Sequence, residues 1–100
     1  MAYEIGAIDE TLAAAAGADG ALFADLRRAF LESLERQVDL LRRSRCDGNW
    51  RMSALRIKGL AASFHAHDLI DLAEEALEGA PGDPAVVRRI EAYLSEYSGA

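Results

Sequence analysis

Apolar residues recur at alternating steps of three and four along most of this chain, which is the spacing that places them on one face of an α-helix. The longest such stripe consists of Phe23, Leu26, Phe30, Leu34, Val38 and Leu41. No segment shows the alternation of apolar and polar residues that is typical of a half-buried strand. The pattern therefore predicts an all-α fold.

Capping residues and helix breakers divide the chain into one short helix and four longer ones. Gly17 ends the first predicted helix, and Asp19, Asn49, Asp68 and Asp83 can cap the other four. The predicted helices span about residues 8–16, 20–45, 50–65, 68–78 and 84–97. Residues 1–100 suffice for one domain with one core, and we expect an up-and-down four-helix bundle preceded by the short helix.

Charge is distributed unevenly along the chain, whose formal net charge is −6. Residues 1–26 hold five acidic and no basic side chains, residues 27–58 hold nine basic and four acidic ones, and residues 59–100 hold two basic and eight acidic ones. The negative total disfavours nucleic acid as a partner, and the basic middle favours an acidic protein surface. The alternative is that these charges only pair on solvated helix faces, as Glu32 and Arg36 can across four residues.

No apolar run is long enough for a membrane span, and the N-terminus lacks the basic start of a signal peptide. The single cysteine, Cys46, cannot form an internal disulfide and has no metal-ligand spacing around it, which fits a reducing compartment. We therefore expect a cytoplasmic protein with no membrane contact, no metal and no cofactor.

A segment of the third predicted helix carries the most specific pattern in the chain. It reads Ala-Leu-Arg-Ile-Lys-Gly over residues 54–59 and Leu-Ala-Ala-Ser-Phe over residues 60–64, and it contains the chain's only lysine. It resembles the signature of histidine phosphotransfer (HPt) domains, which is roughly Ala-His-x-Leu-Lys-Gly, then small residues, an apolar residue, glycine and alanine. The matching residues are Ala54, Ile57, Lys58, Gly59 and Phe64. Leu55 replaces the phosphorylated histidine, and His65 replaces the later glycine.

The resemblance covers nearly the whole chain and implies a four-helix bundle with the acceptor position on the exposed face of the third helix. In that family the acceptor imidazole takes a phosphoryl group from an aspartate of a receiver domain and passes it to another. Phosphoryl transfer needs a nucleophilic atom in line with the phosphorus, and the side chain of Leu55 has no lone pair. The resemblance therefore implies an HPt-like binding protein that is not an enzyme, with a receiver domain or a histidine kinase as its partner.

Helical geometry predicts which residues of the third helix can meet that partner. At about 100° per residue, Leu55 points to solvent. The predicted core face consists of Trp50, Ala54, Ile57, Leu60, Ala61 and Phe64. The predicted partner-binding residues form a small apolar patch with cations along both edges: Arg51, Met52, Leu55, Arg56, Lys58, Gly59 and Ala62. The resemblance places Lys58 beside the acceptor position, and Gly59 leaves the helix surface low enough for close approach.

Two other interpretations remain open at this point. The chain can be an active phosphotransfer protein that uses His65 or His67, or one whose acceptor has been replaced artificially at position 55. His65 lies about 15 Å from Leu55 along a continuous helix, so it cannot occupy the same docking position. Alternatively, the apolar patch meets its own copy in a homodimeric bundle. The two histidines project to nearly opposite sides of a helix and do not suggest a metal site.

Overall fold

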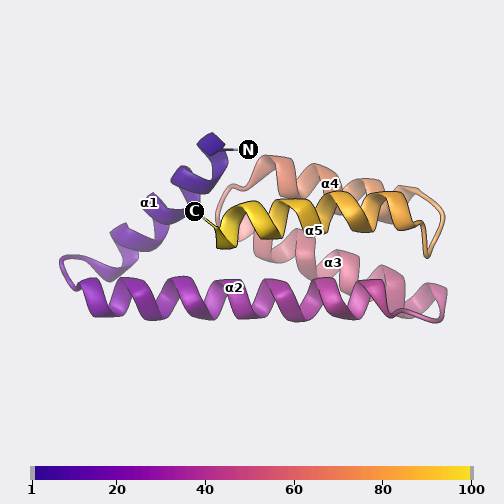
Figure 1. Cartoon of the computed structure of the whole chain (residues 1–100), viewed down its shortest axis with the longest axis horizontal. Helices are drawn as coiled ribbons and strands as arrows, with labels where there is room; N and C mark the ends of the chain where they lie inside the picture. The colour runs from indigo at the N-terminus through magenta and orange to yellow at the C-terminus, as the bar shows by residue number, and fades with distance from the viewer. Residues whose placement is uncertain (1, 100) are drawn as a thin grey trace.

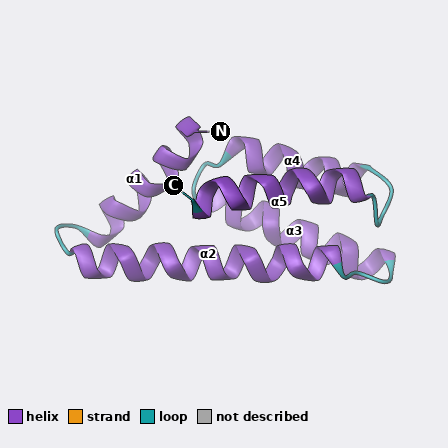
Figure 2. Cartoon of the chain, in the orientation of Figure 1, coloured by secondary structure: helices purple, strands orange, loops and turns teal. Residues whose placement is uncertain are grey.

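The computed structural model describes residues 2–99, and the side chains of residues 4–99. Its helices are α1 (Ala2–Ala16), α2 (Gly20–Arg42), α3 (Asp47–Ser63), α4 (His67–Glu78) and α5 (Pro84–Ser98) (Figure 1). Figure 2 shows that short loops join them and that residues 2–99 contain no strand. The predicted all-α class is confirmed. No helix among these residues is both long and apolar enough to cross a membrane.

Helices α2 to α5 lie side by side and run in alternating directions (Figure 1). Each packs against two of the others, because α3 contacts α2 and α4 while α5 contacts α4 and α2. This arrangement encloses a core between four helices and gives an elongated shape of 44 × 21 × 20 Å. Helix α1 packs against α2 and lies across one end of the other helices, close to the end of α5.

Helix α1 begins earlier than the sequence pattern predicts. The predicted start near Ile8 is wrong, because the helix begins at Ala2 and continues through Gly6. Ile5, Ile8 and Leu12 are all buried, so the apolar period extends one turn further back than the prediction assumed. One helical glycine costs about 1 kcal/mol relative to alanine, and burial of an isoleucine side chain contributes about 1.5–3 kcal/mol, which outweighs it.

The junction between α2 and α3 also differs from the prediction. Helix α2 ends at Arg42, before the predicted end near residue 45, and α3 begins at Asp47, before the predicted start at Trp50. Cys46, not Asn49, occupies the N-cap of α3, and it makes no side-chain capping bond. No buried apolar residue lies between residues 41 and 50, so the apolar period cannot locate either helix end.

Aspartate caps were predicted correctly at two helices. The carboxylates of Asp19 and Asp83 accept hydrogen bonds from backbone N–H groups in the first turns of α2 and α5, at 3.0 and 2.9 Å. The predicted cap at Asp68 is wrong, because Ala66 occupies the N-cap of α4 and Asp68 lies inside the helix. The N-cap of α4 therefore lies two residues before the predicted one.

The turn from α3 to α4 depends on a left-handed residue. His65 has a φ of 54° and is the only non-glycine residue with positive φ in the described part of the chain. Its N–H donates to the carbonyl of Ala62 at 3.2 Å, and the N–H of Ala66 donates to the carbonyl of Ala61 at 2.9 Å, which is the bond pair of a Schellman helix end. The left-handed conformation costs about 1–2 kcal/mol for a residue with a Cβ, so this position favours glycine.

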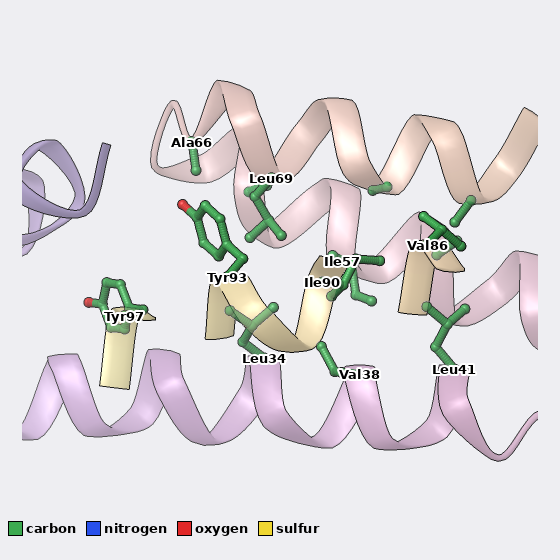
Figure 3. Packing of buried hydrophobic residues seen from close by; sticks show 14 of the residues in the cluster. Leu34, Val38, Leu41, Ile57, Ala66, Leu69, Val86, Ile90, Tyr93 and Tyr97 are labelled. Atoms are coloured by element: carbon green, nitrogen blue, oxygen red, sulfur yellow. The ribbon is translucent and has the colours of Figure 1, made fainter. Parts of the chain in front are cut away.

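The core lies between facing stripes of the four longer helices (Figure 3). Leu34, Val38 and Leu41 point from α2 toward the other helices. The indole Nε1–H of Trp50 donates to the carbonyl of Ala76 at 2.8 Å and so satisfies a carbonyl in the last turn of α4. The predicted core face of α3 is confirmed at Trp50, Ala54, Ile57 and Ala61, whereas Leu60 and Phe64 are only partly buried.

Two carboxylate–tyrosine pairs hold α1 on the end of α5. The hydroxyl of Tyr93 donates to Glu4, and the hydroxyl of Tyr97 donates to Asp9 Oδ1 at 2.9 Å. Asp9 also accepts from Arg27 Nε at 3.3 Å, and Arg27 Nη2 donates to the carbonyl of Tyr97 at 2.9 Å. Burial, and next the bond to a carboxylate, raises the pKa of each tyrosine above its usual value. This part of the fold buries polar groups and pairs them.

Candidate protein-binding site

The residue at the acceptor position of the HPt-like pattern lies on the outer surface of α3. Leu55 is 44% exposed and Met52 is 51% exposed, whereas Ile57 is fully buried. Gly59 and Ala62 are exposed as well. Helical geometry therefore predicted the orientation of these residues correctly. We call them the α3 patch: Met52, Leu55, Gly59 and Ala62.

Gly59 leaves open space in the α3 patch. A Cβ built on it meets no heavy atom within 4 Å apart from the backbone of its own helix. Alanine would fit in its place, and glycine costs a helix about 1 kcal/mol relative to alanine. Packing inside the chain therefore gives no reason for a glycine here. Close approach by another molecule would give one.

One edge of the α3 patch leads to α4. Lys58 Nζ lies 3.8 Å from Glu74 Oε1, and both side chains are close to half exposed. An exposed pair of this kind contributes about 0–1 kcal/mol, so a partner can compete for the lysine at small cost. The pattern predicted Lys58 at this edge but did not predict the pair with Glu74. Arg51 is exposed nearby on the same helix.

The other edge leads to α2, where the sequence prediction missed several residues. Leu40 is 38% exposed, and together with Arg43, Met52 and Arg56 it lines a hollow of about 370 Å³ between α2 and α3. Leu40 lies outside the buried stripe of α2, which includes the next residue, Leu41. An off-stripe leucine is the sequence signal that could have identified it. We call the combined surface the α2–α3 face, which consists of the α3 patch with Arg36, Leu40, Arg43 and Arg56.

Helix α4, which packs beside the Lys58 edge of α3, carries the opposite charge. Helix α4 holds five acidic side chains and no lysine or arginine. Asp71, Glu74, Glu75 and Glu78 line an open hollow, and Glu75 pairs with Arg89 of α5. Helix α3 therefore separates a basic and apolar flank from an acidic one. The electrostatic field of this charge distribution would attract an acidic protein surface to the α2–α3 face.

The two histidines lie at the turn between α3 and α4. Both are exposed; His65 follows the end of α3, and His67 is the first residue of α4. Neither shares the position of Leu55 on the α3 surface. Across the described residues, no three side chains of the His, Cys, Asp or Glu type are grouped so that they could hold a metal ion.

The chain matches no protein-family model, and no curated protein or solved structure is significantly similar to it. The site is therefore interpreted from its own residues. Leu55 offers apolar contact area but no atom that can accept a phosphoryl group. Exposed apolar side chains, a glycine that packing does not require and adjacent cations together favour a protein-binding surface.

Proposed function

We propose that this chain is a non-catalytic, HPt-like binding protein of two-component signalling. It docks a receiver domain or a histidine kinase on its α2–α3 face and transfers no phosphoryl group. The observation that carries the proposal is the position of Leu55. It is exposed on α3 of an alternating four-helix arrangement, where the HPt-like pattern of residues 54–64 places the acceptor histidine. The proposal locates the protein in the cytoplasm with its partner.

The turn after α3 adds support from the backbone. The HPt pattern has a glycine where this chain has His65, and His65 adopts the left-handed conformation that glycine favours. This backbone conformation, ten residues beyond Leu55, supports the proposed likeness at a second position.

The residues around Leu55 support docking without chemistry. Lys58 follows Leu55 by one helical turn, and among the described residues it makes only a long, exposed ion pair with Glu74. Gly59 leaves the surface beside Leu55 open. A partner with an acidic rim would pair with the cations while it buries Leu55 and Met52. The phosphoryl group of such a partner would find no nucleophile at this position.

The two alternative hypotheses fit the surface less well. A phosphotransfer protein that uses His65 or His67 would have to present its acceptor at a turn, away from Lys58. A homodimer through the α2–α3 face would bring Arg36, Arg43 and Arg56 of one copy near those of the other, and like charges across an interface oppose binding.

Chromatography and phosphoryl labelling separate the three hypotheses. The purified chain is run alone and after mixing with each receiver domain and histidine-kinase core of its source organism, and then incubated with receivers that carry a radioactive phosphoryl group. We expect a monomer alone, a complex with at least one receiver or kinase, and no label on the chain. Label that His65→Gln or His67→Gln abolishes would contradict the proposal, as would a stable dimer that binds none of these domains.

A further inference from the structure

A second hollow between α2 and α3 lies beside the α3 patch. Its volume is about 380 Å³, and its polar lining consists of Ser33, Arg36, Gln37, Arg56 and Ser63. Gly59 also lines it, so the hollow and the α3 patch are continuous. We call it the Arg36–Arg56 hollow. Its two arginines come from different helices, and neither was predicted to lie opposite the other.

The two arginines have no partners within the described part of the chain. Neither Arg36 nor Arg56 forms a salt bridge or a side-chain hydrogen bond there. The pair of Glu32 with Arg36 that the sequence spacing predicts is not formed. By contrast, Arg43 at the C-cap of α2 pairs with Asp39 at 2.9 Å. Two guanidinium groups with unused donors therefore line one hollow, and such groups bind carboxylate or phosphate oxygens well.

Gln37, which lines the hollow, carries a hydrogen-bond acceptor that lacks a donor. Gln37 Oε1 is buried and has no hydrogen-bond partner among the described residues. Ser63 cannot supply the donor, because its hydroxyl donates to the carbonyl of Gly59 at 3.0 Å. A buried acceptor left unpaired is unfavourable. Gln37 as a whole is only half-buried, and rotation about its terminal torsion can present the amide oxygen to a ligand in the hollow.

We propose that the Arg36–Arg56 hollow binds an acidic side chain of the docked partner together with an adjacent hydrogen-bond donor. The carboxylate pairs with the two guanidinium groups, and an N–H or O–H beside it donates to Gln37. The hollow is shallow and opens onto the α3 patch, so it suits a side chain carried on a protein surface. This inference rests on the proposed function for the identity of the partner, but the chemistry of the hollow can be tested without that partner.

The first test uses a peptide of the required chemistry. The ¹⁵N-labelled chain is titrated with acetyl-Gly-Asp-Ser-Gly-amide, with the matched Asn peptide and with inorganic phosphate, and its NMR signals are followed. We expect saturable changes at the side chains of Gln37 and Arg56 and at the amide of Gly59. The parent chain should bind the Asn peptide about tenfold or more weakly than the Asp peptide. The double variant Arg36→Gln/Arg56→Gln should lose affinity for the Asp peptide by about the same factor. The double variant Arg88→Gln/Arg89→Gln on α5, which removes the same two charges away from α3, should leave that affinity unchanged.

Three results would overturn the inference. Equal binding of the Asp and Asn peptides would remove the role of the carboxylate. Phosphate that binds as tightly as the Asp peptide would leave a simple anion site. The absence of any saturable change would show that the hollow binds neither. Gln37→Met adds a separate check, because it keeps the length of the side chain and removes the acceptor. This variant should bind the Asp peptide more weakly than the parent chain does, and its affinity for phosphate should be unchanged.

The second test uses any receiver domain or kinase that binds the parent chain. The double variant Arg36→Gln/Arg56→Gln should weaken that complex by about tenfold or more, with an unchanged melting temperature. Unchanged affinity would overturn the hollow as a subsite and leave the proposed function intact. If the chain binds the Asp peptide but no receiver or kinase, the proposed function is overturned and the hollow remains a carboxylate-binding site. The two failures are therefore distinguishable.

Discussion

Polar and apolar groups are arranged in opposite ways in two regions of the molecule. One region is the end that α1 covers, and the other is the α2–α3 face. At the α1 end, Glu4 and Asp9 pair with the hydroxyls of buried tyrosines, and apolar residues of the helix are buried. On the α2–α3 face, Leu55 is exposed and Arg56 has no salt bridge in the described structure. The first arrangement stabilises the fold, whereas the second leaves apolar area and bonding capacity unused. The difference indicates which surface is available to a partner.

The largest expected effect contrasts one residue from each region. Tyr97→Ala removes a fully buried ring and its bond to Asp9, and we expect it to lower the free energy of unfolding by about 3–5 kcal/mol. Leu55→Ala removes an exposed side chain and should change it by less than about 0.5 kcal/mol. Urea denaturation followed by circular dichroism measures both. A large loss for Leu55→Ala would mean that this side chain serves the fold.

Partner affinity should depend on the α2–α3 face, in contrast to the free energy of unfolding. Lys58→Glu reverses a charge beside the α3 patch, and Gly59→Trp fills the open space in it. Each should weaken a receiver or kinase complex by roughly tenfold to a hundredfold in calorimetric titrations, through charge repulsion and steric block respectively. Their melting temperatures should change little. Arg88→Glu on α5 is the control for charge, and if it matched Lys58→Glu the effect would be one of net charge alone.

The α1 end also predicts a loss of stability at alkaline pH. Folding raises the pKa of Tyr93 and Tyr97 above the usual value near 10. As the pH rises above about 10, the unfolded chain therefore loses these protons while the folded chain keeps them. Their contribution is complete below about pH 10 and then falls by up to about 1.4 kcal/mol per pH unit for each tyrosine. Denaturation at stepped pH should show this slope, and Tyr97→Phe should reduce it; an unchanged slope would argue against the buried pair.

A smaller effect is expected at the turn between α3 and α4. His65→Gly relieves the left-handed strain of a residue with a Cβ and should raise the free energy of unfolding by about 1 kcal/mol. His67→Gly is the matched control, and it should lower stability by up to about 1 kcal/mol because it places glycine in the first turn of α4. Thermal denaturation distinguishes the two. Destabilisation by His65→Gly would show that the imidazole has a structural role.

The sequence predicts the helices of this fold better than their ends. Stripes such as Leu34, Val38 and Leu41 identify each helix because burial imposes a period. The start of α1 was missed, although Ile5 continues the buried stripe of Ile8 and Leu12 one turn further back. The cap of α4 was missed because the turn after α3 is set by backbone hydrogen bonds around His65, which side-chain periodicity does not report.

The candidate site was predicted on one helix only. The exposure of Met52 and Leu55 follows from the period of α3 itself. Their neighbours on α2, such as Leu40, depend on how two helices pack, and the apolar pattern does not fix that rotation closely. The same reason hides the placement of Arg36 and Arg56 in one hollow. The sequence therefore predicts the α3 patch, and the packing of α2 against α3 adds the residues that complete the α2–α3 face.

Phosphoryl transfer to a histidine introduced at position 55 tests the central claim most directly. Leu55→His would place an imidazole on the exposed face of α3, one turn before Lys58 and Gly59. With a phosphorylated receiver that binds the chain, the parent should take no label, and the variant should gain an acid-labile phosphohistidine, slowly if the geometry is imperfect. Label on the parent, or a variant that binds the phosphorylated receiver and stays unlabelled, would contradict an HPt-like docking geometry centred on position 55.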